Sequence, residues 1–310
     1  MRQMRLTAIG LMLVAGLFSC GDDSTDDLKP NATANNNNGG NGGGSSSDLV
    51  VAETQNAFVG YVGATWCGPC GSAGGPGFKI IKDSYTNGEV APVYFSSSRS
   101  SKTTAYYVNG SVTNMAPFVN TFNSAMKSKG SIPYFNINGN NEGGAYTSAQ
   151  YTADRYKTFV DSKIAESPVL GIAAKKTLSS DVLSAEVKVK AFSEYTGELY
   201  YSVLVVEKSV QGEQIVGATR QSDYVHSNIV RASLVGDGTM AGQEAFEMFA
   251  SGTTAAGAEF SKSFTLTFDD IDPGPSSIRW FYDPANTEVY AMIWAKENGE
   301  WVFINSVVAQ

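Results

Sequence analysis

The chain has 310 residues, of which 42% are hydrophobic and 17% are charged, enough apolar content for two domains of ordinary size. The formal net charge is −8, and loss of a leader that carries Arg2 and Arg5 but no acid would leave −10. A chain of this charge repels phosphate backbones, so nucleic acid is not an expected partner.

The first 19 residues have the pattern of a secretory signal, with Arg2 and Arg5 before an apolar run at 8–18 that is too short to span a bilayer. The run ends in Leu-Phe-Ser followed by Cys20, which resembles the lipobox of bacterial lipoproteins. The resemblance implies cleavage before Cys20 and acylation of that cysteine. Two or three acyl chains would anchor the protein stably in a membrane. An ordinary signal peptide with a chance cysteine is the alternative.

Residues 20–48 are expected to form a disordered tether behind the anchor. The acidic tract at 22–27 resembles the surface-export signal of Bacteroidota lipoproteins, and a merely solvated acidic stretch is the alternative. The Asn-, Gly- and Ser-rich run at 31–47 has almost no side chain to bury, so it cannot offset the entropy of ordering. In many Gram-negative bacteria an Asp directly after the lipidated cysteine retains lipoproteins in the inner membrane, and here that position is Gly21. The acidic tract and Gly21 together favour lipid anchoring at the outer membrane, facing the periplasm or the cell surface.

Residues 49–166 are predicted to form an α/β thioredoxin-like domain. An apolar run at 57–63 predicts a buried strand. Five residues with a distinctive chemistry follow it: Trp66, Cys67, Gly68, Pro69 and Cys70. Two thiols at this spacing can form a disulfide, and the start of a helix would stabilise the thiolate of the first. Proline suits the first helical turn because no N–H donor is needed there.

This string resembles the active site of thioredoxins and of their TlpA/ResA-like relatives. The resemblance implies thiol–disulfide exchange with protein thiols or disulfides, with Cys67 and Cys70 as the catalytic pair and Trp66, Gly68 and Pro69 binding substrate. A structural disulfide is the alternative. Zinc is not expected, because besides Cys20 the chain offers only these two thiols and one distant histidine. No metal or other cofactor is expected.

The rest of the segment fits the same pattern. Residues 92–95 predict a strand, and helices with one apolar face are predicted from Asn114 and from Ser148. The run from Ser131 to Phe135, with its central proline, resembles the cis-proline strand of thioredoxins. The resemblance implies that Ile132 and Pro133 lie across from the cysteines and bind a substrate strand. A trans proline at a strand start is the alternative.

Three features depart from the thioredoxin pattern. Tyr61 occupies the place of a buried acid, and Glu53 lies too far upstream to be an obvious substitute. Glycines at 71, 74, 75 and 77 weaken the helix after the motif, at about 1 kcal/mol each relative to alanine. A Ser-, Thr- and Tyr-rich insertion at 97–112 lies near where a lid over the site would be. All three lower the expected efficiency of turnover.

Residues 167–310 are predicted to form an all-β, immunoglobulin-like antiparallel sandwich. Alternation at 182–192 predicts a half-buried strand, and the apolar run at 199–206 predicts a central one. The remaining strands are expected at 264–268, 278–282, 289–295 and 301–308, the last two joined by an Asn-Gly turn. The segment 221–231 is expected to interrupt the strands, and its His226 is assigned a structural role because no triad or metal set accompanies it.

Taken as a whole, the chain resembles the Omp-twenty-eight-related outer-membrane lipoproteins. The lipobox, the Cys-x-x-Cys domain and a Tyr-x-His…Arg segment at Tyr224, His226 and Arg231 carry the resemblance. It implies an envelope location with envelope proteins as partners, and it names no substrate. Two functions stay open: thiol–disulfide exchange, or a redox-inert surface binding module in which Cys67–Cys70 is a structural disulfide.

Overall fold

The computed structural model describes residues 49–96, 117–127, 131–141, 146–180, 182–238, 242–267 and 284–310. The predicted signal, the predicted lipidation site at Cys20, the predicted tether, the insertion at 97–112 and the strand predicted at 278–282 lie outside these residues. None of the helices described is both long and apolar enough to cross a bilayer.

A mixed sheet forms around β1 (Ala57–Gly63), which pairs in parallel with β2 (Val90–Ser96) and antiparallel with β3 (Tyr134–Ile137). The short β4 (Asn140–Asn141) pairs antiparallel with β3 and ends the strand order on this side. Every residue of β1 and β2 is buried, which explains their continuous apolar sequences.

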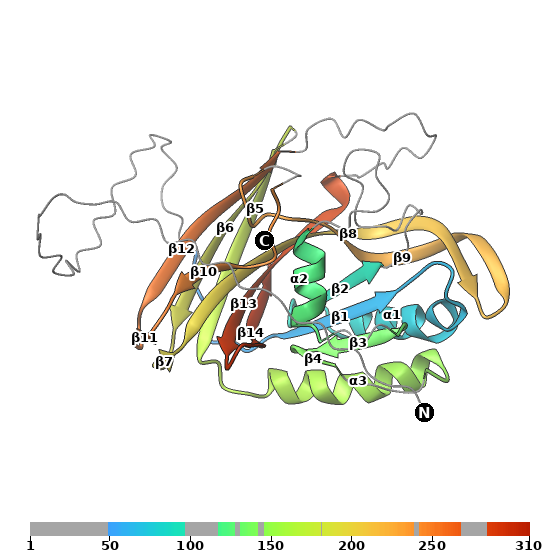
Figure 1. Ribbon diagram of the computed structural model, residues 1–310, viewed down its shortest axis with the longest axis horizontal. Helices are drawn as coiled ribbons and strands as arrows, with labels where there is room; N and C mark the ends of the chain where they lie inside the picture. The colour runs from blue at the N-terminus through green and yellow to red at the C-terminus, as the bar shows by residue number, and fades with distance from the viewer. Residues whose placement is uncertain are drawn as a thin grey trace, which may run out of the picture. The chain divides into compact units, whose positions relative to one another are not determined.

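Helices cover both faces of this sheet (Figure 1). On one face lie η1 (Cys70–Gly74), which is a π-helix, its continuation α1 (Gly75–Ser84), and α3 (Ala149–Ile164). On the other lies α2 (Pro117–Ala125), which buries Phe122 against the sheet. The Cys-x-x-Cys pair stands where β1 meets the first helix. This is the thioredoxin-like arrangement predicted from the sequence.

Helix α3 begins at the residue predicted for it. The Ser148 hydroxyl accepts a hydrogen bond from the N–H of Tyr151 at 3.2 Å, as an N-cap does. Ala153, Tyr156 and Val160 are buried as predicted, but Phe159 is 37% exposed. At about 100° per residue, Phe159 lies roughly 100° from the centre of the buried face, so its assignment to that face was wrong.

The C-terminal half consists of antiparallel sheets, as predicted. Its strands are β5 (Leu170–Ser179), β6 (Val182–Ala191), β7 (Tyr195–Thr196), β8 (Glu198–Val216), β9 (Thr219–Ser233), β10 (Glu247–Ala250), β11 (Thr253–Thr254), β12 (Glu259–Thr267), β13 (Thr287–Glu297) and β14 (Glu300–Val308), with a 3-10 turn, η2 (Pro284–Asn286), before β13. The order β12-β6-β5 forms one sheet, and β11 pairs with β7. The predicted Asn-Gly turn joins β13 to β14, with positive φ at Asn298 and Gly299.

One sheet of nine strands runs through both halves of the chain, in the order β14-β13-β8-β9-β2-β1-β3-β4 with β10 beside β8. The halves join where Tyr94 of β2 pairs in parallel with Ile229 of β9. A second layer, β12-β6-β5, packs on the C-terminal part, and alternate residues of both layers, such as Val187 and Val203, share one apolar core. The boundary predicted at residues 166 and 167 is therefore crossed by strand pairing.

The segment 221–231 does not interrupt the strands, so that prediction was wrong. It belongs to β9, and β8 continues ten residues beyond Val206 to pair with it (Figure 1). In the outer part of the hairpin, after Glu207 in β8 and before its partner Ile229 in β9, the two strands are no longer covered on both faces. The sequence of this part is therefore not continuously apolar. Backbone pairing maintains the hairpin where apolar periodicity stops.

Candidate functional site

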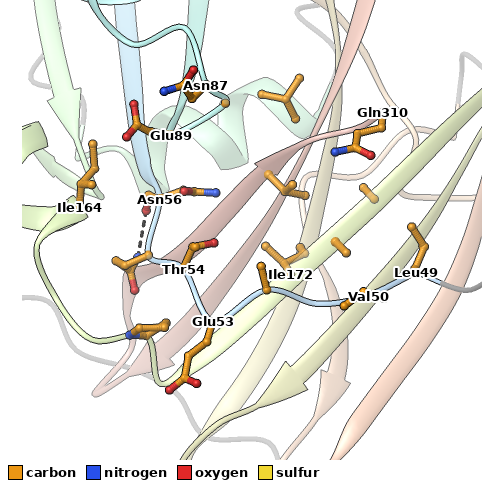
Figure 2. Close-up of a pocket in the computed structure, with 18 of the residues that line it drawn as sticks. Leu49, Val50, Glu53, Thr54, Asn56, Asn87, Glu89, Ile164, Ile172 and Gln310 are labelled. Atoms are coloured by element: carbon orange, nitrogen blue, oxygen red, sulfur yellow. Dashed lines mark hydrogen bonds between the residues drawn. The ribbon is translucent and has the colours of Figure 1, made fainter.

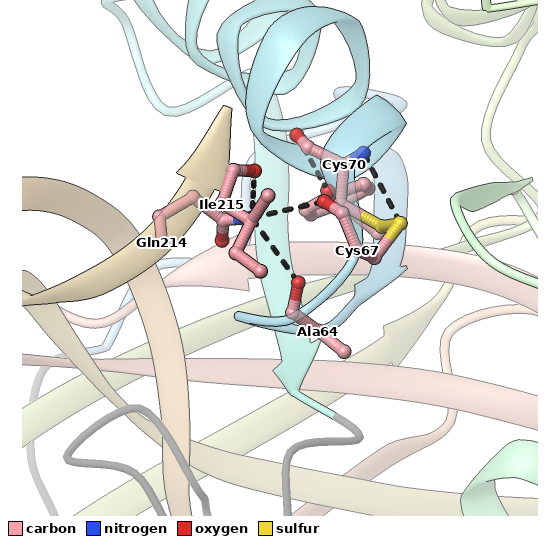
Figure 3. The surroundings of a disulfide bond; sticks show 6 residues. Ala64, Cys67, Cys70, Gln214 and Ile215 are labelled. Carbon is pink, nitrogen blue, oxygen red and sulfur yellow. Dashed lines mark hydrogen bonds between the residues drawn. A yellow bond between two sulfur atoms is a disulfide. The ribbon is translucent and has the colours of Figure 1, made fainter. Parts of the chain in front are cut away.

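Cys67 and Cys70 form a disulfide at the start of the η1–α1 helix, with their Cα atoms 5.2 Å apart. Pro69 has helical dihedral angles and is the helix N-cap. The backbone N–H of Cys70 donates to Sγ of Cys67 at 3.2 Å, and that of Gly71 donates to the carbonyl of Cys67, also at 3.2 Å (Figure 3). In general, an N–H and a helix dipole directed at a cysteine sulfur favour its thiolate form over the thiol.

The two cysteines differ little in access to solvent. Cys67 is 6% exposed and Cys70 is 2% exposed, whereas Trp66 is 63% exposed. Pro69 is also exposed, and Gly68 is half-buried. Both cysteines are therefore largely buried, next to a rim that is exposed at Trp66 and Pro69.

The proline loop lies against the disulfide. The Ile132–Pro133 peptide bond is cis, as the resemblance to thioredoxins implied. Ile132 is half-buried and packs on a small cluster of Ala64, Cys67 and Cys70. The structure thus brings Ile132 and the cysteine pair together from segments more than 60 positions apart in sequence. The substrate-binding role of this loop stays a prediction.

Tyr61 fills the position of the missing acid without its chemistry. The Tyr61 hydroxyl donates to the backbone carbonyl of Cys70 at 3.3 Å. Its ring packs between Phe78, Tyr94 and Phe135, and burial raises the pKa of this hydroxyl well above its ordinary value. Tyr61 is therefore a neutral hydrogen-bond donor at pH 7 and does not accept a proton from Cys70.

Glu53 does not take the place of that acid either. It is exposed and lines a separate cavity of about 820 Å³, near Thr54, Glu89 and Ile172 (Figure 2). Hydrogen bonds between backbone and side chains hold this N-terminal segment on β14, including the one from the N–H of Asn56 to Oδ1 of Asn305 at 2.9 Å.

The far end of the β8–β9 hairpin covers the motif, a contact that the sequence reasoning missed. We call residues 214–217 the hairpin tip. The N–H of Ile215 donates to the carbonyl of Thr65 at 2.7 Å, and the N–H of Gly217 donates to that of Gly68 at 3.2 Å. The strand prediction stopped at residue 206 because apolarity stops there. The β-branched Ile-Val pair before Gly217 was the signal that could have extended it.

Gln214 supports the same contact with its side chain. It is buried, and its Nε2 donates to the carbonyls of Ala64 at 3.2 Å and of Cys67 at 3.0 Å (Figure 3). The approach is so close that a Cβ on Gly68 would lie 2.2 Å from the carbonyl oxygen of Gly217. One on Gly71 would lie 2.3 Å from that of Ile215. Glycine is therefore required at both positions for the hairpin tip to dock.

His226 lies beside the site rather than far from it. A cavity of about 260 Å³ is lined by Cys70, Tyr94, Tyr224 and His226 among others. Burial lowers the pKa of His226 to about 4, so the imidazole is neutral at pH 7. Its Nε2 lies 3.2 Å from the carbonyl oxygen of Glu213, and its ring packs on those of Tyr94 and Tyr224.

The fold and the site together define a thioredoxin-like protein with a Cys-x-x-Cys disulfide. Its structure is similar to that of HBP35 of Porphyromonas gingivalis, with a TM-score of 0.55 and 15% identity over 84% of this chain and 76% of that one. At this identity the similarity shows the fold alone.

Two other solved structures are less similar. A domain of the outer membrane lipoprotein Omp28 from Porphyromonas gingivalis matches 46% of this chain and 88% of its own, with 12% identity and a TM-score of 0.28. A protein from Agrobacterium tumefaciens matches 83% of this chain and 95% of its own, with 11% identity and a TM-score of 0.38. No protein-family model matches the sequence, and no curated protein matches it.

Proposed function

We propose that this chain exchanges thiols and disulfides with partner proteins through Cys67 and Cys70. One observation carries the proposal: the N–H of Cys70, at the start of a helix, donates to Sγ of Cys67 at 3.2 Å. This contact favours the thiolate of Cys67, the species that attacks disulfides. Cys67 is also marginally the more exposed of the two cysteines, at 6% against 2%.

The proposed exchange takes place in two displacement steps. A thiolate of a dithiol partner attacks Sγ of Cys67, the Cys67–Cys70 bond breaks, and Cys70 leaves as a thiolate that takes up a proton from solvent. The second partner thiolate then displaces Cys67, so two electrons pass to the chain and the partner gains a disulfide. The reverse sequence oxidises the chain's dithiol, and the partner's reduction potential sets the direction.

The residues around the pair have distinct roles in this proposal. Trp66, Gly68 and Pro69 form the rim that a substrate meets, and Ile132 and Pro133 orient its backbone. A lipid on Cys20 would anchor the chain at the outer membrane, so that its partners are envelope proteins. The lipobox and the acidic tract that follows it support this location.

A second candidate is a binding module in which the disulfide is only a structural staple. The burial of both cysteines favours it, as does Tyr61, which cannot accept the proton that Cys70 must lose during resolution. The C-terminal sheets would then carry the binding function.

The reduction potential of the pair and the thiol pKa of Cys67 decide between these functions. In a Cys20→Ser background the pair has the only sulfhydryl groups of the chain. Exchange predicts a potential of roughly −120 to −270 mV and, in a Cys70→Ser variant, a Cys67 pKa clearly below about 8.5. A potential below about −300 mV would identify a structural bond and refute the proposal. The Cys70→Ser variant should also trap partners as mixed disulfides, with Cys67→Ser as the matched control.

A further inference from the structure

We propose that the hairpin tip is a size-selective steric barrier over the Cys67–Cys70 pair, and that Gln214 is the specificity-determining residue that holds it closed. A small dithiol reaches Cys67 with the tip docked, whereas a protein partner reaches it only after the tip has moved away. The inference rests on the proposed function, since it concerns which partners react at that site.

The contacts of the tip surround Cys67. Two backbone hydrogen bonds hold the tip to Thr65 and Gly68, one on each side of the cysteine in sequence. The amide of Gln214 adds bonds to the carbonyls of Ala64 and Cys67 itself. The acceptors that a partner's backbone could use along this edge of the motif are therefore already occupied.

The tip is docked by few interactions and is not part of an apolar core. Ile215 and Val216 are half-buried, and residues 217–223 are exposed. Further back, Val210 and Ile229 are buried in the core shared with β1 and α3, so the base of the hairpin is fixed there. Local opening of the outer end costs only its own hydrogen bonds, because no large apolar surface is uncovered.

The opposite wall of the approach is the proline loop. Ile132 packs on the disulfide from another segment, so among the described residues Cys67 lies between this loop and the hairpin tip. A partner strand that paired along Ile132 and crossed Cys67 would collide with the docked tip. A molecule the size of a dithiol needs no such pairing.

Two probes of different size test the barrier, and both reduce the pair by the two-electron exchange given above. Dithiothreitol is the small probe, and reduced thioredoxin is the protein probe. Rates are followed by quenching with a maleimide and resolving the labelled forms by mass. The matched variants are Gln214→Ala and Gln221→Ala, because Gln221 pairs with Gln214 across the hairpin but is exposed.

We expect Gln214→Ala to accelerate reduction by thioredoxin at least about tenfold and reduction by dithiothreitol less than threefold. Tenfold corresponds to about 1.4 kcal/mol, within the range for lost hydrogen bonds to buried carbonyls. Gln221→Ala should change neither rate. Equal acceleration with both probes, or none with thioredoxin, would overturn the size selectivity.

A second variant and a measurement on the unmodified chain protect the test from misfolding. In this shortened-hairpin variant, Asn-Gly replaces residues 213–223 between the paired Gly212 and Tyr224. Its rates of reduction by thioredoxin and by dithiothreitol should change as those of Gln214→Ala do. In the unmodified chain, amide hydrogens at 213–218 should exchange at least a hundredfold faster than those at 199–206. Exchange of both regions at one common rate would mean that the tip opens only on global unfolding and would overturn the barrier.

These readouts separate the inference from the proposed function. The ratio of the two rates reports on access as long as thioredoxin, at about −270 mV, can reduce the pair. A potential below about −300 mV would remove the function and this ratio together, and the hydrogen-exchange comparison, which needs no redox reaction, would then still test whether the tip opens by itself.

Discussion

Replacing Gly68 with alanine should separate the hairpin tip from the motif. The new Cβ would lie 2.2 Å from the carbonyl oxygen of Gly217, and this neighbour is backbone, so the tip must withdraw by about 1 Å. The hydrogen bond from Gly217 to Gly68 is already 3.2 Å long and would break. The shift also strains the bonds that Ile215 and Gln214 make to the same loop. With about 1 kcal/mol net for each of two or three bonds, we expect a loss of about 2–3 kcal/mol in the free energy of unfolding.

Urea unfolding of the oxidised protein, followed by tryptophan fluorescence, measures this loss. The control is the same substitution in the chain with the shortened hairpin, where no Gly217 carbonyl faces residue 68. There the cost should fall below about 0.5 kcal/mol, and the difference between the two backgrounds gives the coupling energy. A similar cost in both backgrounds would show that alanine disturbs the motif itself, and the reasoning about the hairpin would be refuted.

Three further predictions concern a buried aromatic ring, a buried histidine and a buried ion pair. Phe122→Ala should destabilise the protein by about 3–5 kcal/mol in urea unfolding, because the ring is fully buried, whereas alanine at the exposed Phe159 should cost under about 1 kcal/mol. Because the folded-state pKa of His226 is lowered to about 4, the unfolded chain binds the extra proton between pH 6.5 and 4, and stability falls as the pH falls through this window. Between pH 7 and pH 4 the free energy of unfolding of the wild type should fall by about 3 kcal/mol more than that of His226→Gln. Parallel pH profiles of the two proteins would contradict the lowered pKa of His226. Arg231→Met should cost about 3–5 kcal/mol, since it leaves the carboxylate of Glu207 buried without the guanidinium that donates to it at 2.6 Å. The double variant Arg231→Met with Glu207→Gln should be more stable than Arg231→Met alone in the same assay. If the losses of the two single variants simply add in the double variant, the two side chains are not energetically coupled and the reasoning is contradicted.

The elements that the sequence predicted well are those with local causes. Ser148 caps a helix because its hydroxyl satisfies an N–H three residues ahead. The turn at Asn298 and Gly299 forms because both residues tolerate positive φ. Likewise, the strand at 57–63 and the motif after it lie next to each other in sequence, so their junction could be predicted without tertiary information.

The part of the site that was missed depends on distant contacts. Gln214 and the carbonyl of Cys67 are 147 positions apart, and nothing near Gln214 indicates that its amide is buried against a redox motif. For the same reason, the glycine at 71 was interpreted as a weak helix former. Its need for a close backbone neighbour becomes visible only when Ile215 is in place.

The order in which a ribosome makes the chain gives this arrangement a consequence in time. Cys67 is synthesised 147 residues before Gln214. At about 5–20 residues per second, the thiols of a new chain exist for on the order of ten seconds before the segment that covers them has been made. For that interval the two thiols exist without the hairpin tip, so the cover over the motif is acquired only once residues 214–217 have been made and docked.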